Sequence, residues 1–282
     1  MKNPDRNPVL LHAIVALVSI ASCVLALVMG FSWLVAGFFA LSVFSAAVLV
    51  EMGRLIRSNQ AKLKEFHHDA MRSIEQEGVH TRHWMGLIHL LSPRAPLPEM
   101  RGLSTRPDLL AELTREVIAR KPRLILEFGT GISTLIMGYA LQKAGSGRIV
   151  SLEENEPWAS LARAQVALHG LGDVVEIRSA PLANLELKGA TYAWYDLKSY
   201  ADLQHIDMVF VDGPYVCKNR YCALPTTVER LSPSATILTD DARDPDFSAA
   251  LKRWHAEFPE FAQTEVATLR GTARLQRTST ST

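Results

Sequence analysis

The sequence predicts an α/β protein with a mostly parallel sheet, preceded by a membrane anchor. Residues 7–50 contain no Asp, Glu, Lys or Arg, which is far outside the usual pattern of a soluble protein. From residue 107 onward, short apolar runs alternate with helical patterns, which is typical of βαβ units with helices on both faces of a sheet. We therefore expect an anchor over residues 1–50, a helical stalk and proline-rich linker over 51–106, and the α/β domain over 107–282.

The composition excludes several classes of protein. The 282 residues include 30 Lys and Arg against 29 Asp and Glu, a formal net charge of +1. A chain so nearly neutral shows no sign of binding a nucleic acid as its main partner. Hydrophobic residues make up 48% and charged residues 21%, which excludes a disordered or collagen-like chain.

The uncharged stretch is long enough for two membrane spans. A helix needs about 20 apolar residues to cross the hydrocarbon core, and Gly30 and Ser32 divide the stretch into residues 9–29 and 33–50. A cleaved signal peptide has a single short apolar core, so it does not account for this length. The alternative is a buried helical hairpin in a soluble protein, whose helices would normally carry a polar face.

Basic residues flank the uncharged stretch and predict its orientation. Lys2 and Arg6 precede it and Arg54 follows it, and positively charged flanks favour the cytoplasmic side. We therefore expect a two-pass membrane protein with its N-terminus and its α/β domain in the cytoplasm and the lipid bilayer as a partner. Cytoplasmic Cys217 and Cys222 would stay thiols, and their C-x4-C spacing alone is a weak zinc signature.

The segment between the anchor and the α/β domain has two parts. Residues 51–91 are charged with apolar residues at helical intervals, which predicts a stalk helix broken near Gly78. Its histidines have no acidic or cysteine partner at a metal-ligand spacing, so solvated or packing roles are expected. Residues 92–107 contain four prolines, which predicts an irregular linker.

The expected elements of the α/β domain follow one another closely. Pro107 is expected to open an amphipathic helix that stops before Pro122. Strands are predicted at residues 124–126, 148–152, 174–178, 208–211 and 235–239. Helices are predicted at residues 133–142, 157–169, 223–231 and 247–257. A terminal hairpin is expected from residues 263–269 and 272–277 around Gly271.

Polar motifs follow four of the predicted strands, at the edge where parallel sheets bind ligands. Glycines directly after a strand let the backbone approach a ligand closely, and a carboxylate after the next strand can accept two hydrogen bonds from a ribose diol. Three further carboxylates at neighbouring strand ends repel one another unless a cation or a donor lies between them. The motifs are residues 127–134, Glu153, residues 212–214 and residues 240–241.

Together these motifs resemble the class I S-adenosylmethionine (SAM)-dependent methyltransferases. The closest resemblance is to members that carry Glu-x-Gly-x-Gly-x-Ser-Thr, then Ser-x-Glu, Asp-Gly-Pro and a late Asp-Asp, all of which stand here in that order. The likeness begins near Leu97 and runs to the end of the chain. It implies a Rossmann-like, seven-stranded, mostly parallel sheet whose last strand is antiparallel, with helices on both faces.

The resemblance also implies roles for individual residues. Gly129 and Gly131 would cradle the methionine part of SAM, Glu153 would bind its ribose, and residues 180–182 would lie near its adenine. The implied cofactor-binding residues are Glu127, Gly129, Thr130, Gly131, Ser133, Thr134, Glu153, Ala180, Pro181 and Leu182.

The acceptor side of the site rests on a further resemblance, to the catechol-type O-methyltransferases. These hold a divalent cation with an acid after the fourth strand and an Asp-Asn pair after the fifth. Asp212, Asp240 and Asp241 stand here, with Asp in place of Asn, and imply a Mg²⁺ site that would lower the pKa of a bound hydroxyl. Asp212, Lys218 and Arg220 are the implied catalytic residues.

Lys218 is a candidate general base, although it lies farther from the acid than in the catechol-type pattern. Lys218 and Arg220 can equally bind an anionic acceptor, or belong to a solvated loop.

We therefore expect a membrane-anchored, SAM-dependent methyltransferase that methylates a hydroxyl of a glycan, a lipid-linked or a small-molecule acceptor. A membrane tether raises the effective concentration of the enzyme near membrane-bound acceptors. Two alternatives remain: a membrane-tethered binding or scaffold protein that retains the fold, and an NAD-binding oxidoreductase. The NAD-binding class has a third glycine where Thr134 stands.

Overall fold

The computed structural model describes residues 8–30, 32–100, 102 and 104–278. By its internal contacts the chain divides into an N-terminal unit, Met1–Gln76, and a C-terminal unit, Glu77–Thr282. Each unit is described by itself. Lys2 and Arg6, on which the predicted orientation of the anchor partly depends, lie outside the described residues.

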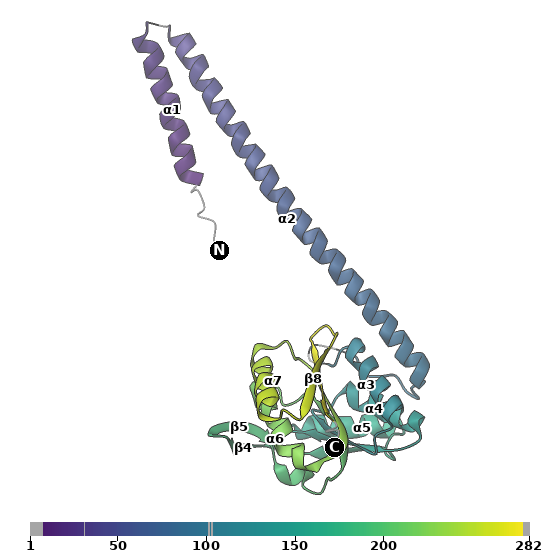
Figure 1. The fold of residues 1–282 in the computed structure, drawn as a ribbon. Helices are drawn as coiled ribbons and strands as arrows, with labels where there is room; N and C mark the ends of the chain where they lie inside the picture. The colour runs from purple at the N-terminus through teal and green to yellow at the C-terminus, as the bar shows by residue number, and fades with distance from the viewer. Residues whose placement is uncertain (1–7, 31, 101, 103, 279–282) are drawn as a thin grey trace. The chain divides into compact units, whose positions relative to one another are not determined.

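The N-terminal unit consists of helix α1 (Pro8–Val28) and most of helix α2 (Trp33–Leu91), joined by a short connection (Figure 1). Within the described part of the chain, α2 is long and apolar enough to cross a membrane, with a stretch of mean hydropathy 2.3 that is unburied. Helix α1 contributes a shorter apolar segment, Ala16–Leu25. One helix is thus long and apolar enough to be a membrane span, and the second predicted span is not confirmed.

Helix α2 continues without interruption to Leu91, so the predicted break near Gly78 is wrong. A single glycine in a helix costs only about 1 kcal/mol relative to alanine, and the long helix tolerates it. The last turns of α2 belong to the C-terminal unit, where Leu87 and Leu91 are buried in the core. Burial of these two leucines stabilises the part of the helix that follows the glycine.

The C-terminal unit is built on a seven-stranded sheet in the order β3-β2-β1-β6-β7-β9-β8. Strands β1, β2, β3, β6 and β7 pair in parallel, and β9 runs antiparallel to both β7 and β8. The strands span Leu124–Phe128 (β1), Arg148–Glu153 (β2), Val175–Ser179 (β3), Ile206–Val211 (β6), Leu231–Thr239 (β7), Phe261–Val266 (β8) and Thr272–Arg277 (β9). The predicted mostly parallel sheet and terminal hairpin are confirmed, and the chain order reverses between β1 and β6, where such sheets bind ligands.

Helices cover both faces of this sheet (Figure 1). Leu126 and Phe128 of β1 belong to one buried cluster together with Trp254, whereas Ile125 belongs to the other together with Leu113. Successive side chains of a strand point to opposite faces, so the apolar residues of β1 supply both cores. The helices span Pro107–Arg120 (α3), Ile132–Ala144 (α4), Glu156–Leu168 (α5), Ala223–Thr227 (α6) and Pro245–Glu257 (α7).

The helix predicted at residues 223–231 is shorter than expected. Helix α6 ends at Thr227, lies between the 3-10 turns η2 (Cys217–Cys222) and η3 (Val228–Arg230), and is followed directly by β7. The hydroxyls of Thr226 and Thr227 donate to the carbonyls of Cys222 and Ala223. Such bonds compete with the regular helical ladder, which favours a short element at this place.

A second, two-stranded sheet was not predicted. Strands β4 (Leu182–Leu187) and β5 (Ala190–Tyr195) form an antiparallel hairpin between β3 and β6. Its turn consists of Lys188 and Gly189, both at positive φ, the conformation that two-residue hairpins require. The hairpin carries Trp194 and Tyr195 into the buried cluster around Phe128.

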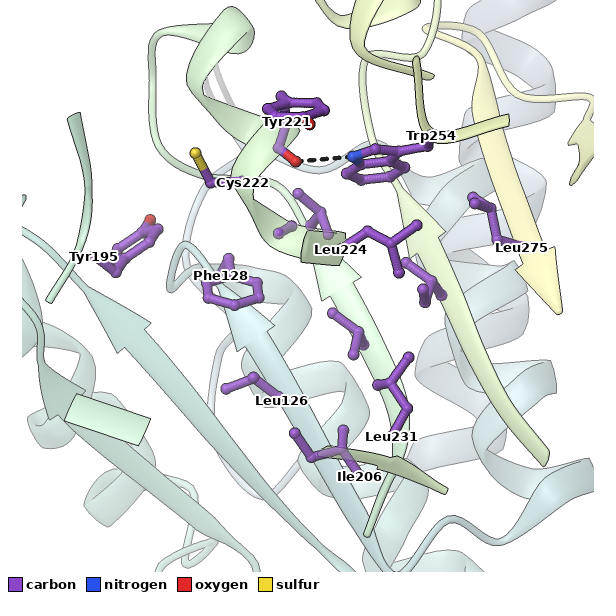
Figure 2. Packing of buried hydrophobic residues seen from close by; sticks show 14 of the residues in the cluster. Leu126, Phe128, Tyr195, Ile206, Tyr221, Cys222, Leu224, Leu231, Trp254 and Leu275 are labelled. Carbon is purple, nitrogen blue, oxygen red and sulfur yellow. Dashed lines mark hydrogen bonds between the residues drawn. The ribbon is translucent and has the colours of Figure 1, made fainter. Parts of the chain in front are cut away.

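Figure 2 shows the core on the α7 side of the sheet, where the fully buried Trp254 belongs to the same cluster as Leu224, Leu231 and Leu275. Its indole N–H donates to the carbonyl oxygen of Tyr221 at 2.8 Å. This bond ties α7 to the turn η2, which leads back to the functional edge of the sheet.

We expect Trp254→Phe to lower the free energy of unfolding by about 2 kcal/mol, because it leaves a small cavity and a buried carbonyl without its donor. Urea denaturation measures this loss. Trp33→Phe, which alters a tryptophan that is 77% exposed, serves as the control. An equal effect of the two substitutions would contradict the structural role of Trp254.

Candidate active site

A cavity of about 890 Å³ lies at the carboxyl ends of the central strands. Its walls come from the loops after β1, β2, β6 and β7, from one side of α5, and from four residues of the proline-rich linker, Pro98, Glu99, Ser104 and Thr105. A volume of this size accommodates a nucleoside-sized ligand and part of a second molecule. The four motifs found in the sequence all meet at this cavity or directly behind it.

The loop after β1 is held from behind by Glu127. This buried carboxyl accepts hydrogen bonds from the hydroxyls of Ser133 and Thr134, both at 2.6 Å, and the Thr134 hydroxyl in turn accepts from the N–H of Gly131 at 3.1 Å. Burial raises the pKa of Glu127 from its ordinary value of 4.5 to about 7. Glu127 and Ser133 do not line the cavity, and they fix the loop that does.

Gly129 marks a close contact between two loops. It has φ +94°, and a Cβ at this position would lie 3.0 Å from the backbone nitrogen of Gly213 and 3.1 Å from the carbonyl carbon of Asp212. The backbone after β1 therefore touches the backbone after β6, and a side chain at residue 129 would separate them. Gly131, which also lines the cavity, begins α4 and leaves backbone N–H groups at its N-terminus.

Glu153 ends β2 and lies at the wall of the cavity, 8% exposed. Its two carboxylate oxygens accept from the backbone N–H groups of Thr130 at 3.2 Å and Asn155 at 3.0 Å. Burial raises its pKa. Because each carboxylate oxygen has a second lone pair, a carboxylate fixed in this way can still accept from two ligand hydroxyls.

The acidic side of the cavity is formed by Asp212 after β6 and by Asp240 and Asp241 after β7. Their carboxylate oxygens lie within 4.8 Å of one another, and Asp212 accepts from the hydroxyl of Thr105 at 2.9 Å. Burial is the largest cause that raises the pKa of Asp212 to about 7 and that of Asp240 to about 8. The predicted cluster of three carboxylates is thus assembled, and Asp240 is its most buried member.

Arg220, which was predicted as a catalytic residue, is buried against this cluster. One guanidinium nitrogen lies 3.0 Å from a carboxylate oxygen of Asp241 and another lies 3.6 Å from Asp212. Arg270 adds a second guanidinium, 3.7 Å from Asp240 and 3.8 Å from Asp241. Oxygen donors are the right type for Mg²⁺, but with two guanidinium groups already paired to them the residues present do not fit a divalent cation.

Some predicted site residues lie elsewhere. Lys218 is exposed on η2 and is absent from the cavity wall. Ala180, Pro181 and Leu182 do not line the cavity either, although the N–H of Ala180 donates to the carbonyl of Glu153 directly behind its wall; the chain continues from there into the unpredicted β4–β5 hairpin. The side of the cavity near α5 is lined instead by Trp158, Leu161, Ala162, Gln165 and Val166.

Among the lining residues that the sequence did not reveal, three make contacts that shape the site. Tyr195, at the end of β5, is buried at the cavity wall beside Gly213. Trp158 on α5 donates its indole N–H to the carbonyl of Thr130 at 3.1 Å, and Thr105 contacts Asp212. The Lys188–Gly189 turn between extended runs was the one available signal for Tyr195, whereas the other two depend on tertiary contacts.

The buried carboxyl of Glu127 predicts a pH-dependent stability. Because its folded-state pKa is raised to about 7, its contribution is fully present below pH 4.5 and is lost as the pH rises through 7. Relative to Glu127→Gln, the wild type should lose on the order of 3 kcal/mol over this window. Urea denaturation at several pH values measures the difference, and Glu260→Gln, at an exposed position, is the control. A difference in free energy of unfolding between wild type and Glu127→Gln that stays constant with pH would refute this prediction.

Comparisons with known proteins agree with this architecture. Residues 126–242 match the family model described as a methyltransferase domain. The fold is similar to the O-methyltransferase from Bacillus cereus in complex with SAH, at 21% identity over 70% of this chain and 91% of that chain, with a TM-score of 0.51.

Two further solved structures share the fold. Cofactor-bound Rv0187 from MTB has 22% identity over 70% of this chain and 89% of its own, with a TM-score of 0.51. The O-methyltransferase TomG from Streptomyces achromogenes, in complex with SAM, has 20% identity over 63% and 82%, with a TM-score of 0.50. Residues 126–242 therefore match a methyltransferase domain, and the C-terminal unit has the Rossmann-like fold of these solved structures.

Proposed function

We propose that the enzyme binds SAM in the 890 Å³ cavity and methylates a hydroxyl of an acceptor that enters on the Asp212 side. The observation that carries this proposal is the Glu153 carboxylate, which two backbone N–H groups fix at the wall of the cavity, beside the glycine loop after β1. Two solved structures of similar fold are O-methyltransferases that hold SAH or SAM, which supports the assignment of the cofactor and of oxygen as the methylated atom.

The charge of the cavity favours SAM over a dinucleotide. Among the described residues that line it are seven carboxylates and one guanidinium, that of Arg220. Such a wall attracts the sulfonium and ammonium groups of SAM and repels the pyrophosphate of NAD.

In the proposed reaction, bound SAM supplies an electrophilic methyl group on its sulfonium. The residues of the chain orient the reactants: Glu153 accepts from the ribose hydroxyls and the loop at Gly129 and Gly131 contacts the methionine part. Asp212 is placed to accept the proton of the acceptor hydroxyl, because its carboxylate lies at the cavity wall and Lys218 does not. Positioning of this kind is the main contribution a protein makes to an in-line displacement.

The acceptor side of the cavity has an apolar mouth. Tyr215 and Val216, which follow the Asp-Gly-Pro motif, are exposed and line the cavity. An acceptor with an apolar part next to its hydroxyl would cover this surface. Within the predicted range of acceptors, a lipid-linked molecule or a glycan on a lipid carrier is the class that we favour, and a free small molecule is the second.

We further propose that the N-terminal unit anchors the enzyme in a membrane with two spans, with the N-terminus and the methyltransferase domain on the cytoplasmic side. The long apolar stretch of α2 supports this, as do exposed apolar side chains on both helices, including Leu17, Ile20, Trp33 and Phe38. Exposed apolar surface of this extent is unfavourable in water. Anchoring would place the cavity near membrane-bound acceptors.

A scaffold protein that retains the fold is the competing function. It would have no need for a fixed carboxylate at the cavity wall or for a glycine at the contact between two loops. Both features are present at Glu153 and Gly129, and they favour an intact cofactor site.

Calorimetric titration with SAM and SAH tests the cofactor. We expect Glu153→Ala to weaken binding at least about 100-fold, because two hydrogen bonds to a charged group are lost. Glu176→Ala, on the exposed side of β3, is the matched control and should bind as the wild type does. No binding to the folded wild type would refute the proposal and favour the scaffold.

Membrane topology can be tested independently. A cysteine introduced by Ser32→Cys lies next to the connection between α1 and α2 and should react with a membrane-impermeant maleimide from outside intact cells. A cysteine introduced by Ser73→Cys on α2 should be protected until the cells are opened. Equal labelling of the two before opening would contradict the two-pass arrangement, and release of the protein by alkaline extraction would contradict anchoring itself.

A further inference from the structure

We propose that the guanidinium of Arg220 takes the place that a divalent cation would occupy in the acceptor site, so that this enzyme needs no metal ion there. The inference rests on the proposed function, because it concerns the charge balance beside the reacting hydroxyl. It departs from the Mg²⁺ site that the resemblance to the catechol-type O-methyltransferases implies.

Arg220 is held in one position by contacts on every side. Its Nε donates to the carbonyl of Pro214 at 3.0 Å and one terminal nitrogen donates to the carbonyl of Asp212 at 2.8 Å. The other terminal nitrogen donates to a carboxylate oxygen of Asp241 at 3.0 Å, and the guanidinium lies 5.9 Å from the ring centre of Phe247. With its side chain only 5% exposed, Arg220 cannot swing into solvent without breaking this network.

The guanidinium of Arg220 lies where a positive charge is needed to offset the repulsion between the carboxylates. It contacts both Asp212 and Asp241, the two members of the cluster that line the cavity. A divalent cation bound between these two carboxylates would lie next to a fixed positive charge in a buried site, where repulsion is poorly screened. Arg270 lies 3.7 Å from Asp240, within ion-pair distance, so two guanidinium groups lie beside the three carboxylates.

The local sequence builds this arrangement. The turn η2 (Cys217–Cys222) follows the Asp-Gly-Pro motif closely, so that Arg220 folds back over the end of the strand that carries Asp212. Trp254 of α7 fixes the same turn through the carbonyl of Tyr221. Planar, multidentate hydrogen bonding of this kind suits arginine and would not be reproduced by lysine.

If Arg220 replaces the cation, Asp212 and Asp241 accept hydrogen bonds from the acceptor hydroxyl directly. A carboxylate paired with a guanidinium keeps lone pairs for an acceptor hydroxyl, and the proton of that hydroxyl passes to a carboxylate oxygen. Arg220 is in this scheme a positioning residue, since it acts through the carboxylates.

Binding of Mn²⁺ to the full chain, followed by electron paramagnetic resonance and by thermal denaturation, tests the inference without an acceptor. We expect the wild type to bind no Mn²⁺ up to millimolar concentrations and to unfold at the same temperature with Mg²⁺ or with a chelator. Arg220→Met should be less stable and should bind Mn²⁺ at least about 100-fold more tightly, with a rise in melting temperature on addition of the ion. Arg220→Met combined with Asp241→Asn should lose most of that gain.

Stoichiometric micromolar binding of Mn²⁺ to the wild type, lost in Asp241→Asn, would overturn the inference. If Arg220→Met fails to fold, the wild-type titration decides by itself. Titration of SAM into the wild type, with and without Mn²⁺, separates the two proposals. Failure to bind SAM refutes the cofactor assignment. Binding of SAM that becomes stronger when stoichiometric Mn²⁺ is present refutes the role of Arg220.

Discussion

The cavity depends on one buried carboxyl group, that of Glu127, at the end of the central strand β1. Two hydroxyls of α4 donate to it, and through Thr134 it also holds the N–H of Gly131. This network fixes the path of the chain from strand to helix, and thereby the direction of the backbone groups that face the cavity. Burial makes ionisation of Glu127 unfavourable, so the loop is held by an acid whose charge the hydroxyl partners only partly stabilise.

From this fixed loop the rest of the site follows by contact. Gly129 touches the backbone at Asp212 and Gly213, and Thr130 donates to Glu153. The end of β1 is thus joined to the end of β6 by backbone contact and to the end of β2 by the Glu153 carboxylate. A site built in this way is rigid on the side where we place the cofactor, and it owes that rigidity to the neighbouring positions of parallel strands in one sheet.

The acceptor side is organised by charge rather than by backbone contact. Asp212, Asp240 and Asp241 would repel one another if left alone, and Arg220 and Arg270 lie among them. The same buried arginine therefore stabilises the fold and sets the chemistry that the carboxylates can perform. Breaking a buried ion pair of this kind is costly because it leaves an uncompensated charge, which ties the local stability of the turn η2 to the integrity of the site.

The sequence by itself determined the order of strands and helices, the terminal hairpin and the four motifs at strand ends, because apolar periodicity and glycine placement are local properties. It could not show the β4–β5 hairpin that delivers Tyr195 to the cavity wall. It also placed Asp212, Asp240 and Asp241 at neighbouring strand ends, where they would repel one another unless a cation or a donor lay between them. Only the tertiary structure decided that Arg220 lies against two of them, because a charge balance in space depends on segments that the fold brings together.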